Sequence, residues 1–231
     1  MKITTYEGLI QDLMDNKISM VPHDCFKTIL NHYGEIQEIE GDIIECGVWR
    51  GGFSIFLSYV FPDKNIWVCD SFEGFQPVEE AKYGYTRGER HHPKALNSPW
   101  GSLAVSLGDV QSNFQKYGLE NQDRIKFVKG FVKDTLPTLD IEKISLLRID
   151  VDSYSATLEV LNELYDKVQP GGYIIFDDSC LIESLDAIKT FLYSRDLPFH
   201  FYHPATNEKL EIEQFSMSED GLYPEGCYII K

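Results

Sequence analysis

The sequence predicts an α/β protein with a doubly wound, mostly parallel sheet of seven strands and helices on both faces. Three observations support this fold class. Short apolar segments alternate with segments of helical periodicity from residue 42 onward. Several strand-like segments, such as 173–176, are apolar throughout, which is typical of strands buried on both faces of a parallel sheet. Four of the five central strands end in an acidic residue, so their carboxyl ends would gather at one edge of the sheet.

The individual elements follow in chain order. Residues 1–40 predict an N-terminal helical segment, because apolar residues recur with helical spacing on both sides of Pro22. Helices are also expected at 51–61, about 155–168 and about 183–194. Together these elements predict one domain over residues 1–231. Strands are expected at 42–46, 66–70, 125–129, 144–149 and 173–177, the last opened by a Pro170-Gly171-Gly172 turn, with terminal strands near 199–203 and 227–231.

Composition excludes several classes of protein. The net charge of -16 and a pI of about 4.7 argue against nucleic acid as a partner, but fit a divalent metal or a small neutral or cationic ligand. The five cysteines are scattered without zinc spacing and are expected to be reduced thiols. Residues 1–20 lack the apolar core of a signal peptide, and no apolar stretch reaches the ~18 residues that span a bilayer. We therefore expect a cytoplasmic protein without a membrane partner.

Residues 75–100 do not follow the pattern of alternating strands and helices. They are rich in Gly, Pro, Tyr and basic residues, and a long irregular insertion in a compact domain is usually functional or disordered. We interpret it as a lid over the strand ends. His91, His92 or Glu89 could act there as a general base once the lid closes, although adjacent loop histidines are more often simply solvated.

A glycine-rich loop, Glu45-Cys-Gly-Val-Trp-Arg-Gly-Gly52, joins the first strand to the next helix. Its glycines stand at positions 47, 51 and 52, so the dinucleotide pattern GxGxxG is not met. Glu45 would repel a pyrophosphate, but could order the loop around a cationic methionine moiety. The alternative is a tight turn between strand and helix that binds no ligand.

Asp70 ends the second strand, about 20 residues after the first loop glycine. An acid at this place can accept both hydrogen bonds from a ribose diol. A nicotinamide or an adenosyl ligand would satisfy it equally well. The alternative is that Asp70 caps the segment that follows.

Asp150, Asp177 and Asp178 follow two further strands that are expected to be central in the sheet. A site of carboxylates without histidine favours Mg²⁺ or a similar hard cation. Such an ion would lower the pKa of a substrate hydroxyl and orient it toward an electrophile. In the alternative interpretation Asp152 or Asp178 caps the following helix.

Several segments of the chain resemble the macrocin O-methyltransferase (TylF-type) family, whose members methylate sugar hydroxyls on macrolides and related natural products. The resemblance runs from about residue 41 to 191. It is carried by GDIIECGVWRGG (41–52), DSFEGF (70–75), SLAVSLGDVQSNFQKYGL (102–119), KGFVKDTLP (129–137), the long segment LLRIDVDSYSATLEVLNELYDKVQPGGYIIFDDS (146–179) and AIKTF (187–191).

This resemblance implies a class I methyltransferase fold, which is Rossmann-like, with S-adenosylmethionine and Mg²⁺ as cofactors. It implies Mg²⁺ on Asp150, Asp177 and Asp178, with Asp150 also close enough to the acceptor to serve as base. A homo-oligomer is expected as well. The donor is placed by the resemblance on Glu45, Gly47, Val48, Trp49, Gly51, Asp70 and Ser71, with adenine contacts near Ser106, Gly130 and Phe131.

The sequence therefore predicts a Mg²⁺-assisted O-methyltransferase that acts on a hydroxyl of a sugar or glycosylated natural product. Two other classes remain open at this point: a nicotinamide-dependent oxidoreductase, and a non-catalytic protein that binds an adenosyl ligand. The chain departs from the family pattern at Ser179, at residues 180–186 and in the predicted lid. The identity of the acceptor is therefore not predicted.

Overall fold

A computed structural model describes residues 5–76, 83, 103–197, 200–210 and 226–231. Apart from residues 75, 76 and 83, the predicted lid lies outside the described residues. Glu89, His91 and His92 therefore also lie outside them. No helix in the described part of the chain has both the length and the apolar character needed to cross a membrane.

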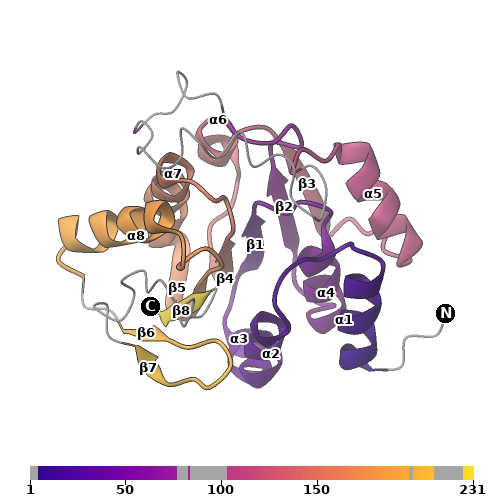
Figure 1. The fold of residues 1–231 in the computed structure, drawn as a ribbon, viewed down its shortest axis with the longest axis horizontal. Coiled ribbons are helices and arrows are strands. Elements are labelled where there is room, and N and C mark those ends of the chain that lie inside the picture. Colours follow the sequence, from indigo (N-terminus) through magenta and orange to yellow (C-terminus); the bar gives the residue numbers. More distant parts are fainter. Residues whose placement is uncertain (1–4, 77–82, 84–102, 198–199, 211–225) are drawn as a thin grey trace.

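The centre of the fold is one twisted sheet in the order β3-β2-β1-β4-β5-β8-β6-β7 (Figure 1). The first five strands in this order are parallel, and the last three are antiparallel to their neighbours. The predicted α/β class with a mostly parallel sheet is thus confirmed. The strands are β1 (Asp42–Cys46), β2 (Ile66–Asp70), β3 (Ile125–Lys129), β4 (Ile144–Ile149), β5 (Val168–Phe176), β6 (Phe201–Tyr202), β7 (Lys209–Leu210) and β8 (Cys227–Ile230).

The sheet has eight strands where the sequence predicted seven. The additional strand is β7, which pairs with β6 over two residues. Its sequence was not predicted as a strand because it contains no run of apolar residues. β5 also begins earlier than predicted, at Val168 instead of Tyr173. The turn expected at 170–172 is part of this strand. The N–H of Gly171 donates to the carbonyl of Lys231, and the N–H of Lys231 donates to the carbonyl of Gly172.

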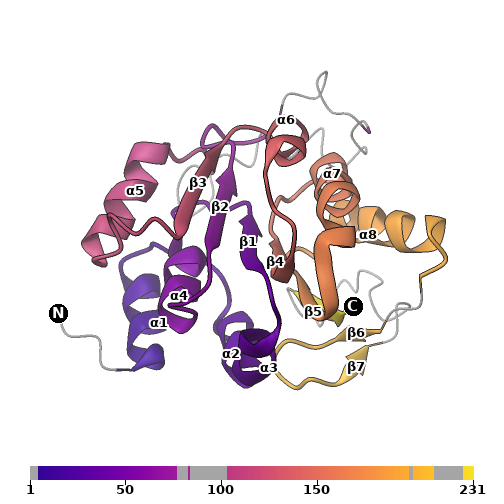
Figure 2. The same ribbon diagram turned by 180° about the vertical axis from the view of Figure 1, so that it is seen from behind.

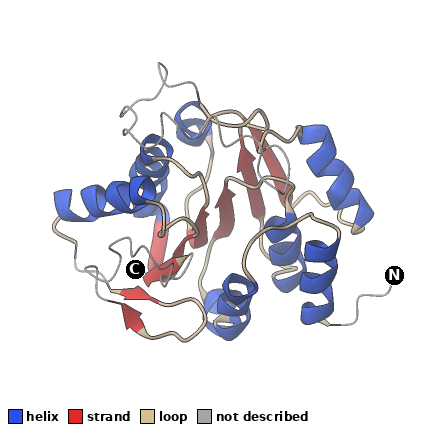
Figure 3. Ribbon diagram, in the orientation of Figure 1, coloured by secondary structure: helices blue, strands red, loops and turns tan. Residues whose placement is uncertain are grey.

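Helices cover both faces of the sheet (Figures 2 and 3). α1 (Tyr6–Asp15), α2 (His23–Asn31), α4 (Gly52–Val60) and α5 (Leu107–Lys116) contribute to the apolar core on one face, and α7 (Tyr154–Leu164) and α8 (Ile182–Ser194) to the core on the other. Neighbouring residues of β1 point to opposite faces, so Ile43 enters the first core and Ile44 the second. The short helices α3 (Tyr33–Glu38) and α6 (Val132–Thr135) complete the described α-helices, and short 3-10 helices cover Leu136–Thr138 and Tyr165–Lys167.

Helix α5 was not among the predicted elements. Only Val110 and Phe114 of its ten residues are buried, so its apolar stripe is narrow. Its start is defined by Ser106, whose side chain accepts a hydrogen bond from the N–H of Asp109 at 3.2 Å. A cap of this kind is a local signal that sequence inspection could have used.

A cluster of hydrogen-bonded rings attaches the N-terminal helices to the last strands. The His32 Nδ1 lies 3.0 Å from the hydroxyl of Tyr173, and its Nε2 lies 3.0 Å from the hydroxyl of Tyr228. Tyr228 also donates to Oδ1 of Asn207 at 3.1 Å. Burial raises the pKa of both Tyr173 and Tyr228 to about 12, so both hydroxyls keep their protons at neutral pH.

Candidate active site

A cavity of about 400 Å³ lies at the carboxyl ends of β1, β2, β4 and β5, where ligands of open parallel sheets are expected. Most of the predicted site residues line it, whereas Gly51, Ser106 and Gly130 are not part of its wall. The predicted residues that line it are Glu45, Gly47, Val48, Trp49, Asp70, Ser71, Phe131, Asp150, Asp177 and Asp178.

The glycines of the loop after β1 are required by contacts within the protein. A β-carbon on Gly47, which has φ +84°, would stand 1.6 Å from the carbonyl oxygen of Asp150. On Gly51, with φ +82°, it would stand 2.9 Å from the ring of Phe114, and on Gly52 it would stand 2.6 Å from the carbonyl oxygen of Ile18. Their missing side chains make room for the end of β4, for α5 and for the segment after α1.

Asp70 holds the loop in place through its carboxylate. Oδ2 accepts the N–H of Val48 at 2.8 Å and that of Trp49 at 3.3 Å, and Oδ1 accepts the N–H of Phe72 at 2.7 Å. Burial raises the pKa of this carboxyl, and the three backbone donors oppose that rise. The sequence predicted a contact with a ribose diol, which stays a prediction. The structure adds a role that the sequence did not indicate, since these oxygens already order the loop.

Arg148 lines the cavity and is a residue that the sequence did not single out. It lies on β4 with no exposed surface, and Nη1 donates to Oε1 of Glu45 at 2.5 Å and to Oδ2 of Asp150 at 2.8 Å. Nη2 donates to Oδ1 of Asp177 at 2.5 Å. Glu45, in β1, also accepts a hydrogen bond from the hydroxyl of Ser54, so its carboxylate belongs to this buried network. The sequence does contain a signal for this network, which is a single arginine in the otherwise uncharged strand 144–149. An arginine buried in such a strand requires acidic partners.

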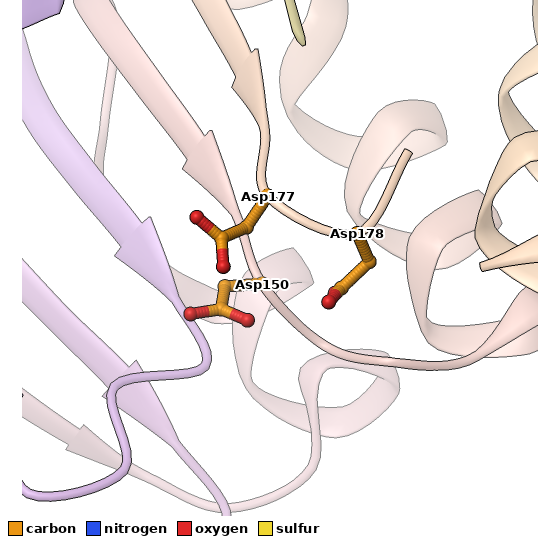
Figure 4. A group of neighbouring side chains, drawn as sticks. All are labelled: Asp150, Asp177 and Asp178. Carbon is orange, nitrogen blue, oxygen red and sulfur yellow. The ribbon is translucent and has the colours of Figure 1, made fainter. Parts of the chain in front are cut away.

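The three predicted metal ligands converge at the ends of β4 and β5 (Figure 4). Asp150, Asp177 and Asp178 each offer an oxygen, and these oxygens all lie within 4.8 Å of one another. Burial is the main cause that raises the pKa of Asp150 and Asp178 well above the ordinary value, and neighbouring carboxylates add to it. A set of oxygen ligands with this charge suits a hard divalent cation.

The helix-capping alternative for these acids is not what the structure shows. The side chain of Ser153 caps α7 by accepting the N–H of Ala156 at 3.2 Å. The N–H of Asp152 donates to Oδ2 of Asp178 at 3.0 Å, which ties the turn after β4 to the turn after β5.

Of the three residues predicted near the adenine, one lines the cavity and two do not. Ser106 is exposed and caps α5, while Phe131 lines the cavity at the start of α6. A β-carbon on Gly130, with φ +141°, would lie 2.7 Å from the methyl group of Thr135, so this glycine lets the chain turn from β3 into α6. Trp49 lies at the cavity with the guanidinium of Arg50 4.4 Å from its ring centre.

One wall of the cavity comes from residues that the sequence analysis did not single out. The segment 18–22 between α1 and α2 lines it, and Gly52 packs directly against Ile18 and Ser19. This wall arises because α1 packs on α4. α4 begins at the loop glycines, with Gly51 as its N-cap and Gly52 as its first residue. No local pattern in the sequence predicts that contact.

The model of the family described as macrocin O-methyltransferase (TylF) matches residues 15–201 of the chain. Mycinamicin III 3''-O-methyltransferase of Micromonospora griseorubida is 36% identical over 183 residues, covering 76% of this chain and 66% of the relative. The 8-demethyl-8-(2,3-dimethoxy-alpha-L-rhamnosyl)-tetracenomycin-C 4'-O-methyltransferase of Streptomyces olivaceus is 36% identical over 172 residues, covering 72% of this chain and 62% of the relative.

Among solved structures, the O-methyltransferase NovP superposes with a TM-score of 0.70 at 28% identity, covering 98% of this chain and 78% of that one. The chain spans slightly less than two thirds of the length of the two curated relatives above. The resemblance inferred from sequence motifs is confirmed: the chain belongs to the macrocin O-methyltransferase (TylF) family.

Proposed function

We propose that this protein transfers the methyl group of S-adenosylmethionine to a hydroxyl of a sugar or glycosylated small molecule, with Mg²⁺ at Asp150, Asp177 and Asp178. The observation that carries the proposal is the union of two features in one cavity. The loop after β1 and the three clustered carboxylates both line it, in a chain that belongs to a family of O-methyltransferases.

The donor half of the cavity has the chemistry that a sulfonium cofactor requires. Val48, Trp49 and Phe131 offer apolar and aromatic surface, and Asp70 and Ser71 offer polar groups beside it. The acidic residues of the cavity favour a cationic ligand over an anionic one. In this proposal Asp70 acts by holding the backbone of Val48 and Trp49 in the shape that receives the donor.

The metal half supplies oxygen ligands at one end of the same cavity. Arg148 binds Oδ2 of Asp150 and Oδ1 of Asp177, so each of these aspartates keeps its second oxygen for another partner. These carboxylates would hold Mg²⁺, and the bound ion would lower the pKa of a substrate hydroxyl and orient it. In this proposal Asp150 accepts the proton of that hydroxyl, and the cavity walls hold donor and acceptor in one orientation.

The class of acceptor is inferred from the relatives. One of them is named for a rhamnosyl-bearing tetracenomycin and one for mycinamicin III. We therefore propose a hydroxyl on a glycosylated small molecule as the acceptor of this protein. The acidic surface is consistent with a neutral or cationic acceptor.

The proposal is tested in two steps on the purified protein. Isothermal titration calorimetry with S-adenosylhomocysteine should show one binding site, and no heat at millimolar ligand would refute the donor site. Transfer of labelled methyl groups to a panel of glycosylated acceptors should require Mg²⁺ and stop on addition of EDTA. Methyl transfer that is unaffected by EDTA would refute the metal part and leave the donor part intact.

A further inference from the structure

We propose that Arg148 is the positioning residue of the metal site, because its guanidinium fixes the carboxylates of Asp150 and Asp177 in the orientation that receives a divalent cation. The inference rests on the proposed function, and it assigns a role to a residue that is not itself a metal ligand. It follows from the strand order, the hydrogen bonds of the guanidinium and the charge that surrounds it.

The strand order places Arg148 at the centre of the carboxylate group. β4 lies between β1 and β5, and Arg148 stands opposite Glu45 in β1 and Ile175 in β5. From this position one side chain reaches acids that belong to three neighbouring strands or their ends. Its two terminal nitrogens bond to all three acids, Nη1 to Glu45 and Asp150 and Nη2 to Asp177.

The geometry of guanidinium is suited to fixing directions. Its planar fork donates along set directions, whereas the ammonium of lysine is a compact charge on a flexible stem. Nη1 holds one oxygen of Asp150 and Nη2 holds one oxygen of Asp177, which restricts rotation of both carboxylates. Asp178 is held separately, by the N–H of Asp152 at 3.0 Å.

The guanidinium is itself held by residues that are not candidate metal ligands. Glu45 binds Nη1 and is anchored by the hydroxyl of Ser54, and the ring centre of Phe53 lies 4.3 Å from the guanidinium carbon. All three anchoring residues are buried. Residues that bind metal ligands without binding the metal orient those ligands, and loss of such contacts typically lowers metal affinity about 10- to 100-fold.

The charge of the group argues that this arrangement serves more than folding. Glu45, Asp150 and Asp177 are bonded to one guanidinium, and Asp178 lies beside Asp150 and Asp177. Four carboxyl groups thus gather near one fixed positive charge, an arrangement that favours the binding of a cation. Buried ion pairs contribute little net stability, and well-packed apolar residues often replace them without loss. A fully buried arginine that is bonded to two candidate ligands is therefore explained better by their alignment than by stability.

The test measures metal binding on folded protein, independently of turnover. Arg148→Lys keeps the positive charge but loses the fork, so Mn²⁺ affinity measured by electron paramagnetic resonance should fall about tenfold or more. The matched control is Arg124→Lys, because within the described part of the chain Arg124 donates its hydrogen bonds to the carbonyls of Ser58, Phe61 and Lys64 and not to a carboxylate. Arg124→Lys should bind Mn²⁺ like the wild type.

A second variant keeps the inference testable if Arg148→Lys does not fold. Glu45→Asp shortens the anchor of the guanidinium by one methylene, and Mn²⁺ affinity should fall although Glu45 is not a proposed ligand. Wild-type affinity in a folded Arg148→Lys or Glu45→Asp variant overturns the positioning role and leaves the proposed function standing. Absence of Mn²⁺ binding to the wild type overturns the metal part of the proposed function and this inference together.

Discussion

Gly47 and Asp150 are in such close contact that a β-carbon on Gly47 would stand 1.6 Å from the Asp150 carbonyl oxygen. The loop that is proposed to receive the donor therefore packs directly against the strand end that carries a proposed metal ligand. The N–H of Asp150 also donates to the carbonyl of Cys46 at 2.8 Å, so the two strand ends are bonded as well as packed. Disturbing this contact should affect both halves of the cavity.

Gly47→Ala should therefore lower the free energy of unfolding by about 2–5 kcal/mol, from the left-handed backbone and the steric overlap together. The control is Gly118→Ala, because Gly118 also has a positive φ but open space around it, and only the backbone cost of about 1–2 kcal/mol is expected there. Urea denaturation measures both. An equal decrease in the free energy of unfolding in the two variants would mean that the contact with Asp150 does not restrict the residue at position 47.

Asp70→Asn should loosen the loop after β1. The amide keeps one acceptor oxygen and presents an NH₂ group toward backbone donors, so at least one of the hydrogen bonds to Val48, Trp49 and Phe72 is lost. We expect a loss of about 1.5–3 kcal/mol in stability and about tenfold or more in affinity for S-adenosylhomocysteine. Calorimetry measures the affinity. Asp140→Asn, at an exposed position, controls for the change of charge, and unchanged affinity in Asp70→Asn would contradict the role of Asp70 in the loop.

Asp178→Asn is the cleanest probe of the metal site. Asp150 and Asp177 also bind Arg148, so their replacement disturbs a buried ion network, whereas the contact recorded for Asp178 is with the N–H of Asp152. We expect Mg²⁺ affinity to fall about tenfold or more while S-adenosylhomocysteine binds as before. Asp186→Asn, an exposed acid on α8, is the control. Wild-type Mg²⁺ affinity in Asp178→Asn would remove this residue from the ligand set.

The ring cluster around His32 predicts a dependence of stability on alkaline pH. The pKa of Tyr173 and that of Tyr228 are raised to about 12 in the folded protein, against about 10 in an unfolded chain. The folded state thus holds these protons more tightly, and their contribution is intact below pH about 10 and lost as pH rises toward about 12. Urea denaturation at several pH values should show a shallower decline for a Tyr173→Phe/Tyr228→Phe double variant than for the wild type.

Tyr193→Phe is the matched control for the tyrosine pair, since Tyr193 is 62% exposed. Its decline in stability with pH should match that of the wild type. The same slope in the double variant as in the wild type would contradict the assignment of tightly held protons to the ring cluster.

The sequence by itself determined the features that depend on neighbouring residues. Short segments rich in apolar residues at 42–46, 66–70, 125–129 and 144–149 predicted strands that the structure has in the same places, because hydrophobic periodicity is a local property. The acids that follow strands could be placed at one edge of the sheet for the same reason. Sequence motifs also indicated the family of the chain, and the comparisons confirmed it.

Only the tertiary structure decided which of these residues face each other. Arg148 meets Glu45 because β4 lies beside β1, although about a hundred residues separate them in the chain. The loop glycines leave room for the end of β4, for α5 and for the segment 18–22. All three are distant from the loop in sequence and reach it only through the fold. Strand order and helix packing arise from burying the whole apolar surface at once. Contacts that depend on them, and with them the alignment of the carboxylates, cannot be predicted from any single segment.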